Sequence, residues 1–345
     1  MAFSRKDFLK STAILGTAGL TFGAAGVSPD SPKKRVTNAP KIKPKALKPG
    51  DTLGLVAPAS PIYEDSVFEE MLENLRDMGF KLKLGKHVRD QRGYLAGTDE
   101  NRAADLMSMF EDDRVDAIMC IRGGWGCNRI LPLLDYELIR NNPKMLVGFS
   151  DITSLHMALY SQSDLISFHG PVGKSMWTDF TKKAFMNITQ KGAKTEFTIP
   201  AEFDDSFVVA PGKVKGPLFG GNLSVFSAMV GSEFLPSFDG AILFLEDVGE
   251  SVYRIDRMIT QLKLAGILDR ISGFVFGKCT ECSAGENSLT MQQLLDDHIK
   301  PLGIPAFYGA MISHEDNNIT LPVGLEAEID ADQRTIKVLE SGVRT

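Results

Sequence analysis

The sequence predicts an α/β protein that contains a parallel sheet. Short apolar runs alternate with amphipathic helical segments from residue 51 onward. Strands that alternate with helices in this way form parallel sheets with right-handed crossovers. Of the 345 residues, 43% are hydrophobic and 24% are charged, as in ordinary globular proteins. Because ligands of such sheets bind beyond the carboxyl ends of the strands, functional residues are expected there.

An N-terminal α/β domain is predicted over residues 49–171. A buried strand is expected at 52–57, where an apolar run ends in Pro58. Ser66 and Glu69 have the spacing of a capping box and open a helix that Gly79 ends. The inward stripe of that helix is predicted to be Val67, Met71, Leu75 and Met78. Further strands are expected at 80–84, 115–121, 145–148 and 165–168, with helices after Thr98 and from Ile152.

The pattern changes after residue 171. Residues 172–212 are predicted to connect two domains and to hold one helix, at 181–190. Residues 213–345 are predicted to form a mixed C-terminal domain. Its expected strands are 241–245, 273–276, 325–329 and 335–339, and its expected helices are 252–265 and 289–298.

Residues 1–30 are typical of an export signal. Basic residues at the start lead into an apolar stretch and then into small residues, with cleavage expected near residues 25–27. The segment SRKDFLK (residues 4–10) resembles the twin-arginine motif, with Lys6 in place of the second Arg. Residues 31–48, rich in Pro and Lys, are predicted to be a tether. We therefore expect a periplasmic protein with no membrane attachment once the signal is removed.

Charge and cysteine content exclude several classes. With 38 basic and 44 acidic residues the net charge is −6, and no basic stripe is visible, so nucleic-acid binding is not expected. Four cysteines are too few for a disulfide scaffold. Cys279 and Cys282 form one CxxC, compatible with a disulfide after export or with two inert thiols, and without further ligands it does not indicate zinc. No metal and no cofactor are expected.

Ser150 lies where a strand, 145–148, runs into a helix. A serine on such a turn can act as a nucleophile, while the first amides of the helix stabilise an oxyanion. The alternative is a helix N-cap. The neighbouring strand ends in Arg122 and the glycines of GGWG (123–126), which allow backbone N–H groups to approach a ligand or simply form a tight turn.

Acids and histidines complete the candidates. The strand 241–245 ends in Glu246 and Asp247, which serve as chemical acids or as structural caps. Of five histidines, His314 in a polar loop and His169 at a strand end are the candidate bases. Arg122 is a candidate for binding a substrate carboxylate, since its guanidinium fits one, and the Gly-Pro turn after His169 suits a substrate-binding or structural ring.

Together these segments resemble the LD-carboxypeptidase family of serine peptidases, which includes murein tetrapeptide carboxypeptidases and microcin C immunity peptidases. The resemblance extends over residues 50–325. The matching stretches are GDTLGLVAPASP, AIMCIRGGWGCNRILPLLDY, NPKMLVGFSDIT, FHGP, LFGGNLS, LFLEDVGESVYRIDRMITQL and SHEDNNITLPVG. One departure is Ser313 before His314, where the family has glycine.

The resemblance implies a flavodoxin-like or amidotransferase-like N-terminal domain and a swivelling β/α C-terminal domain. It implies a triad of Ser150 as nucleophile, His314 as base and Glu246 as orienting acid. The oxyanion donors would be the amides of Asp151 and Gly124, with Gly123 as an alternative. Because the triad comes from both domains, the site is expected in the cleft between them.

The expected activity is release of the terminal D-Ala from murein tetrapeptides by hydrolysis of an L,D-peptide bond. One alternative is hydrolysis of a microcin-like peptide–nucleotide carboxamide. A different class is an exported two-domain solute-binding protein, which has the sheets and the cleft but no use for the triad. The expected partner is a murein peptide, and a homodimer is left open.

Overall fold

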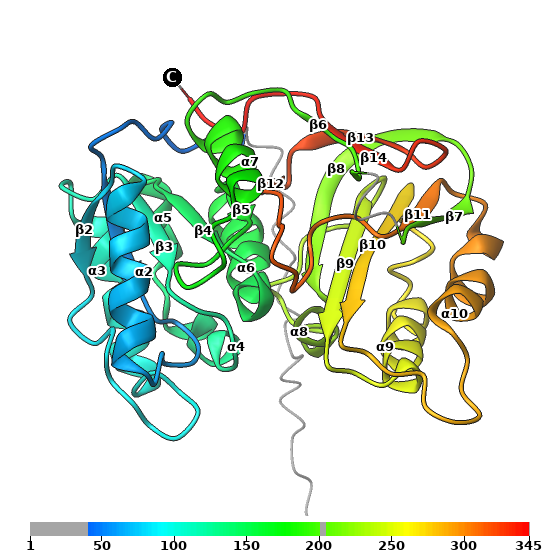
Figure 1. The fold of residues 1–345 in the computed structure, drawn as a ribbon, viewed down its shortest axis with the longest axis horizontal. Coiled ribbons are helices and arrows are strands. Elements are labelled where there is room, and N and C mark those ends of the chain that lie inside the picture. The colour runs from blue at the N-terminus through cyan, green and yellow to red at the C-terminus, as the bar shows by residue number, and fades with distance from the viewer. Residues whose placement is uncertain (1–40, 201–204, 345) are drawn as a thin grey trace, which may run out of the picture. The chain divides into compact units, whose positions relative to one another are not determined.

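The computed structural model describes residues 41–200 and 205–344, which form two sheets with helices packed around them (Figure 1). The predicted α/β class is confirmed. The expected signal, 1–30, and the first part of the tether lie outside the described residues. None of the described helices is long and apolar enough to cross a membrane.

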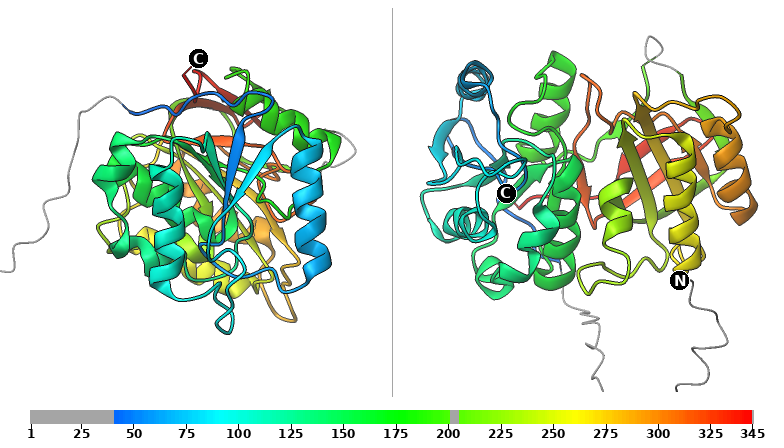
Figure 2. Two further views of the ribbon diagram at one scale, coloured as in Figure 1. Left: turned by 90° about the vertical axis from the view of Figure 1, so that its left-hand side faces the viewer. Right: turned by 90° about the horizontal axis from the view of Figure 1, so that it is seen from below.

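The first sheet has the order β12-β5-β4-β3-β1-β2 and is parallel except at β12. Helices cover both of its faces, and the left view of Figure 2 shows its blue strands between α2 and the teal helices. The side chains of β3 alternate between two core clusters, one shared with α2 and α7 and the other with α3 and α6. The strands are β1 (Thr52–Val56), β2 (Lys81–Leu84), β3 (Ala117–Cys120), β4 (Met145–Gly148), β5 (Ser167–His169) and β12 (Leu321–Val323). The helices are α2 (Asp65–Asp77), α3 (Asp99–Glu111), α4 (Cys127–Ile130), α5 (Tyr136–Asn141), α6 (Thr153–Ser163) and α7 (Asp179–Thr189), with short 3-10 turns at Leu131–Leu133 and Ser150–Ile152.

The second sheet has the order β6-β14-β13-β8-β9-β10-β11-β7. Its central strands β8 to β11 are parallel, and the outer ones pair antiparallel. The strands are β6 (Glu196–Phe197), β7 (Phe207–Ala210), β8 (Lys213–Asn222), β9 (Ile242–Val248), β10 (Gly273–Thr280), β11 (Ala306–Tyr308), β13 (Glu326–Asp330) and β14 (Thr335–Val338). The helices are α8 (Leu223–Ala228), α9 (Val252–Leu264) and α10 (Met291–His298), with a 3-10 turn at Lys300–Leu302.

The chain does not divide at residue 212 as cleanly as predicted. After β11 it returns to the first sheet, where β12 pairs antiparallel with β5, and then re-enters the second sheet as β13. The predicted connection, 172–212, contributes α7 to the first layer and β6 and β7 to the second sheet. The end of the predicted tether is also part of the fold, since Ile42 bridges Leu165 and Leu47 is buried.

For helix α2 the predicted cap was wrong, and the predicted inward stripe was right in part. The helix α2 begins at Asp65 behind Glu64, with no side-chain cap, so Ser66 is not a capping residue. Of the predicted stripe Met71 and Leu75 are buried, but Phe68 and Leu72 complete the buried face in place of the exposed Val67 and the half-buried Met78. The spacing of Ser66 and Glu69 lies inside the helix and not at its start.

Candidate active site

Ser150 stands at the carboxyl end of β4, on the turn that leads into α6. Its φ is +64°, in the left-handed region that residues other than glycine rarely adopt. Gly123 lies directly against it, because a Cβ on Gly123 would come within 2.7 Å of the Ser150 Cβ. No side-chain capping bond is made at this turn. The hydroxyl of Ser150 is therefore presented above the sheet and is not used as a helix N-cap.

His314 approaches Ser150 from the loop between β11 and β12. Its Nε2 lies 3.0 Å from the Ser150 Oγ, and its Nδ1 lies 2.8 Å from Oε2 of Glu246. Burial lowers the pKa of His314, but the neighbouring carboxylates of Glu246 and Asp247 outweigh it, so the net pKa is raised. The three candidate residues thus form one continuous hydrogen-bonded chain, with Glu246 on the Nδ1 side.

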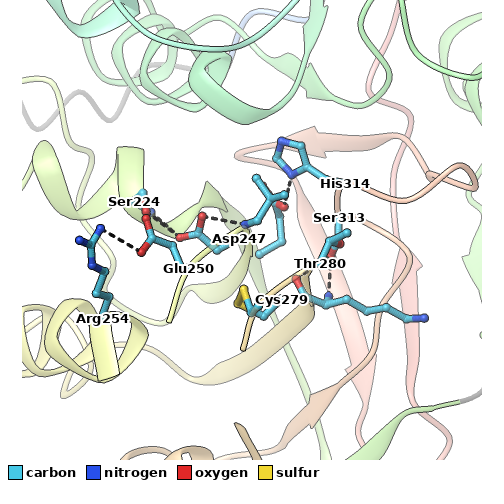
Figure 3. Close-up of a disulfide and its surroundings, with 12 residues drawn as sticks. Ser224, Asp247, Glu250, Arg254, Cys279, Thr280, Ser313 and His314 are labelled. Atoms are coloured by element: carbon cyan, nitrogen blue, oxygen red, sulfur yellow. Dashed lines mark hydrogen bonds and ion pairs between the residues drawn. A yellow bond between two sulfur atoms is a disulfide. The ribbon is translucent and has the colours of Figure 1, made fainter. Parts of the chain in front are cut away.

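Glu246 is fully buried on β9. Its Oε1 accepts a hydrogen bond from Asn222 Nδ2 at 3.2 Å, so each carboxylate oxygen has a partner. The same Asn222 amide donates to Asp247, which also accepts from the backbone and hydroxyl of Ser224 (Figure 3). Burial, and then the charge of Glu246, raise the pKa of Asp247 to about 6. The negative charges of the two neighbouring carboxylates therefore favour the protonated form of the His314 imidazole.

The loop that carries His314 is held to the second sheet by the preceding residue, Ser313. The Ser313 hydroxyl accepts from the Lys278 N–H and donates to the Lys278 carbonyl on β10. It fits there because Gly277 has no side chain, and a Cβ at Gly277 would lie 2.3 Å from the Ser313 Oγ. The serine that replaces the family's glycine thus fastens the loop to the second sheet.

His169 does not lie in the cleft. Its ring is fully buried at the end of β5, between Phe149 and Phe244. Nε2 lies 2.9 Å from the carbonyl oxygen of Ile312, two residues before His314, so the ring supports the loop. Of the two roles expected for His169, the structure therefore supports the structural one, because the buried ring is not among the residues that line the cavity.

The loop of residues 123–126, called the glycine loop here, provides an amide N–H beside Ser150 that makes no hydrogen bond with the described residues. The Gly123 carbonyl accepts from Ser60 N–H, and the N–H of the same peptide unit, on Gly124, points the opposite way. In the described part of the chain no hydrogen bond uses the Gly124 N–H. Asp151 turns its carboxylate away, to accept from the Cys127 N–H at 2.8 Å.

A cavity of about 890 Å³ opens over Ser150 and His314. Its walls combine the glycine loop, an exposed pair of aromatic rings and charged side chains of both signs. Tyr94 and Trp125 are packed edge to face with their ring centroids 6.4 Å apart. The charged lining residues are Arg122, Arg129, Asp151, Lys174, Asp247 and Glu250. Such a cavity is large enough for a short peptide.

The LD-carboxypeptidase N-terminal domain model matches residues 53–170, and the C-terminal domain model matches 215–329. This chain belongs to the LD-carboxypeptidase family. It is accordingly an enzyme, a serine-type carboxypeptidase by its family.

Relatives support this membership. The chain is 40% identical over 309 residues to a probable murein peptide carboxypeptidase of Bacillus subtilis, covering 87% of this chain and 95% of that one. It is 30% identical to the murein tetrapeptide carboxypeptidase of Pseudomonas aeruginosa, covering 81% and 94%. The solved structure of the immunity protein MccF with glutamyl sulfamoyl guanosine matches with a TM-score of 0.83 at 27% identity, covering 88% and 99%.

Some features of this LD-carboxypeptidase were missed from the sequence. Lys174 and Asn222 line the cavity; Lys174 lies in none of the matching stretches, and Asn222, although it lies in LFGGNLS, was given no role. Cys279 and Cys282 are joined in a disulfide at the end of β10 (Figure 3), one of the alternatives left open by the CxxC. Among the described residues no cluster of three or more His, Cys, Asp or Glu side chains could hold a metal ion.

Proposed function

We propose that this LD-carboxypeptidase releases the terminal D-Ala of murein tetrapeptides by hydrolysing an L,D-peptide bond. The observation that carries the proposal is the continuous chain from Ser150 Oγ through the His314 ring to Glu246, at 3.0 and 2.8 Å. The names of the relatives from Bacillus subtilis and Pseudomonas aeruginosa support the choice of substrate.

In the proposed mechanism His314 Nε2 takes the proton of Ser150 as its oxygen attacks the scissile carbonyl carbon. Glu246 fixes the tautomer through Nδ1 and stabilises the imidazolium that forms. The N–H groups of Gly124 and Asp151 stabilise the oxyanion, each by about 3 kcal/mol. His314 then protonates the leaving amine of D-Ala, and a water molecule, deprotonated by His314, releases the acyl group from Ser150.

The test is incubation of the enzyme with purified murein tetrapeptides and mass spectrometry of the products. Loss of one D-Ala, absent with Ser150→Ala, is the expected result. An unchanged tetrapeptide would contradict the proposed substrate.

Hydrolysis of a microcin-like peptide–nucleotide carboxamide is the second candidate, favoured by the similarity to MccF. The same assay with an aminoacyl sulfamoyl nucleoside distinguishes the two by their kcat/KM values. The third expectation, an exported solute-binding protein, is not retained, because the chain belongs to a family of carboxypeptidases.

We further propose that the enzyme is exported to the periplasm by the signal in residues 1–30. The disulfide between Cys279 and Cys282 supports this, because disulfides persist in oxidising compartments.

A further inference from the structure

Two cations line the cavity next to Ser150. Arg122 directly precedes the glycine that lies against the serine. Lys174 follows β5, and its backbone is fixed beside the end of β3, since the Gly173 N–H donates to Cys120 and the Lys174 N–H to Ile121, at 2.9 and 3.0 Å. Two positive charges from separate strand ends are thereby held on one wall of the cavity.

Neither cation has a counter-ion in the described residues. The Arg122 guanidinium donates to the Pro61 carbonyl at 2.6 Å and makes no ion pair with a described carboxylate. The Lys174 ammonium makes neither a hydrogen bond nor an ion pair with the described residues, and the one carboxylate among them whose charge acts on its pKa is Glu64. The Lys174 side chain is exposed to solvent, and crowding by its neighbours, followed by the charge of Arg122, lowers its pKa. Two neighbouring positive charges repel each other, and an anion beside them relieves that repulsion.

The acids of the lining that lie near the end of β9 belong to the second sheet. These are Asp247 and Glu250, and Glu250 lies 3.5 Å from Arg254 of α9 (Figure 3). Lys174 is also near enough to the base for its charge to act on the pKa of His314. An anionic group of a ligand is thus attracted to Lys174 and Arg122, close to the reacting atoms, and repelled by Asp247 and Glu250.

We propose that Lys174, with Arg122 beside it, binds the C-terminal carboxylate of the amino acid that the enzyme releases. This rests on the proposed function, because in a carboxypeptidase that carboxylate is separated from the scissile nitrogen by a single carbon atom. The ammonium is then a specificity-determining group: it restricts cleavage to the last peptide bond, since an internal residue carries no carboxylate there. The Lys174 ammonium attracts the carboxylate as a point charge, and the planar guanidinium of Arg122 orients it through hydrogen bonds.

The experiment compares a murein tetrapeptide with its C-terminal amide. Binding is measured by calorimetry in the Ser150→Ala background, with and without Lys174→Met, and kcat/KM is measured in the active enzyme. The parent is expected to bind the free acid about 10- to 100-fold more tightly than the amide, as for a hydrogen bond to a charged group. Lys174→Met should remove most of this preference by weakening acid binding only. Lys174→Arg should restore part of it. Lys183→Met, an exposed lysine on α7 outside the cavity lining, is the control and should change nothing.

Equal binding of acid and amide by the parent, or an unchanged preference in Lys174→Met, would overturn the inference. The proposed function is judged separately, by turnover of the tetrapeptide in the active enzyme. If the enzyme turns over the tetrapeptide but binds acid and amide equally, the proposed function stands and the role of Lys174 is wrong. If acid binding depends on Lys174 but the tetrapeptide is not hydrolysed, the role of Lys174 stands and the proposed function is wrong.

Discussion

The backbone of Ser150 is strained, and the strain has a use. A positive φ on a residue other than glycine costs of the order of 1 kcal/mol or more and persists only where the surroundings enforce it. Here the enforcement comes from β4 on one side and from Gly123 on the other. The hydroxyl is thereby aimed at His314 before any substrate binds, so no reorganisation is needed at the moment of attack.

Ser150→Ala and His314→Ala should each lower the turnover number by about three orders of magnitude or more, because the two residues act as one unit. The double variant should be barely worse than either single one. Steady-state kinetics on the three variants checks this. His169→Ala serves as the contrast, and it should lower the thermal midpoint while leaving most of the turnover, because its ring only supports the Ile312 carbonyl. A collapsed turnover with His169→Ala and a normal one with His314→Ala would reverse the assignment.

The pH dependence follows from the same residue. His314 must be neutral to accept the Ser150 proton, and its pKa is raised above the usual 6.5. We therefore expect kcat/KM to be lost as pH falls, beginning above pH 6.5. Asp247→Asn removes one of the negative charges that raise the pKa of His314, so the fall of kcat/KM on the acidic side of the pH profile (the acidic limb) should move to lower pH. A limb that stays in place or moves upward, in a variant with unchanged circular dichroism, would contradict this.

The candidate site shows which residues a sequence can reveal. Ser150, Glu246 and His314 each follow an apolar run and stand in motifs, so their types and family order predicted them together. His169 has the same kind of position, yet its ring points into the core, since a strand end does not say which face its last side chain takes. Lys174 was missed because a lone lysine in a loop is ordinary until the fold places it beside Arg122.

Among the elements, β8 joins the two halves of the site. Gly220 and Gly221 have φ values of +147° and +138° and no room for a side chain, since a Cβ on Gly221 would lie 2.3 Å from the Thr153 Oγ1 on α6. The next N–H, on Asn222, donates to the same Thr153 hydroxyl at 2.9 Å. The strand therefore lies close enough to α6 to bring Asn222 and Glu246 up to the loop of Ser150.

Gly221→Ala should lower stability by more than Gly231→Ala. Both positions have positive φ, but a Cβ on Gly231 meets nothing within 4 Å, so that variant measures backbone strain alone. Backbone strain should cost about 1–3 kcal/mol at either position, and overpacking against Thr153 should add about 1–3 kcal/mol at Gly221. Urea unfolding of both variants provides the comparison. Equal midpoints would mean that β8 and α6 can move apart without cost.

Several strands were not predicted from the sequence, for two physical reasons. The strand β8 contains a proline and three glycines, residues that normally argue against a strand, and they are tolerated here because of tertiary packing. The strands β6, β11 and β12 have only two or three residues each, too short for a period to be visible. The longer strands β9 and β10 were predicted, because burial on both faces leaves a continuous apolar run in each.

At the scale of the whole molecule, export is a prediction that can be tested in cells. The mature protein should begin after about residue 25 and fractionate with the periplasm, because the basic start and apolar stretch of residues 1–30 are typical of a signal. N-terminal sequencing of protein purified from cells checks it. A variant with Arg5→Gln and Lys6→Gln should accumulate as the uncleaved precursor. An intact Met1 on the parent protein would contradict export.

The return of β12 to the first sheet limits how the chain can be recombined. An exchange with a relative at residue 213 would replace the partner of β5, so a foreign strand would have to pair with His169 and Phe168. The loop of His314 would come from the same relative as the foreign strand, whereas Ser150 would come from this chain. A chimera of this kind inherits its nucleophile and its base from different ancestors, and its activity depends on the edge pairing as much as on the triad. Crossovers that keep β5 and β12 together should yield active progeny far more often than crossovers between them.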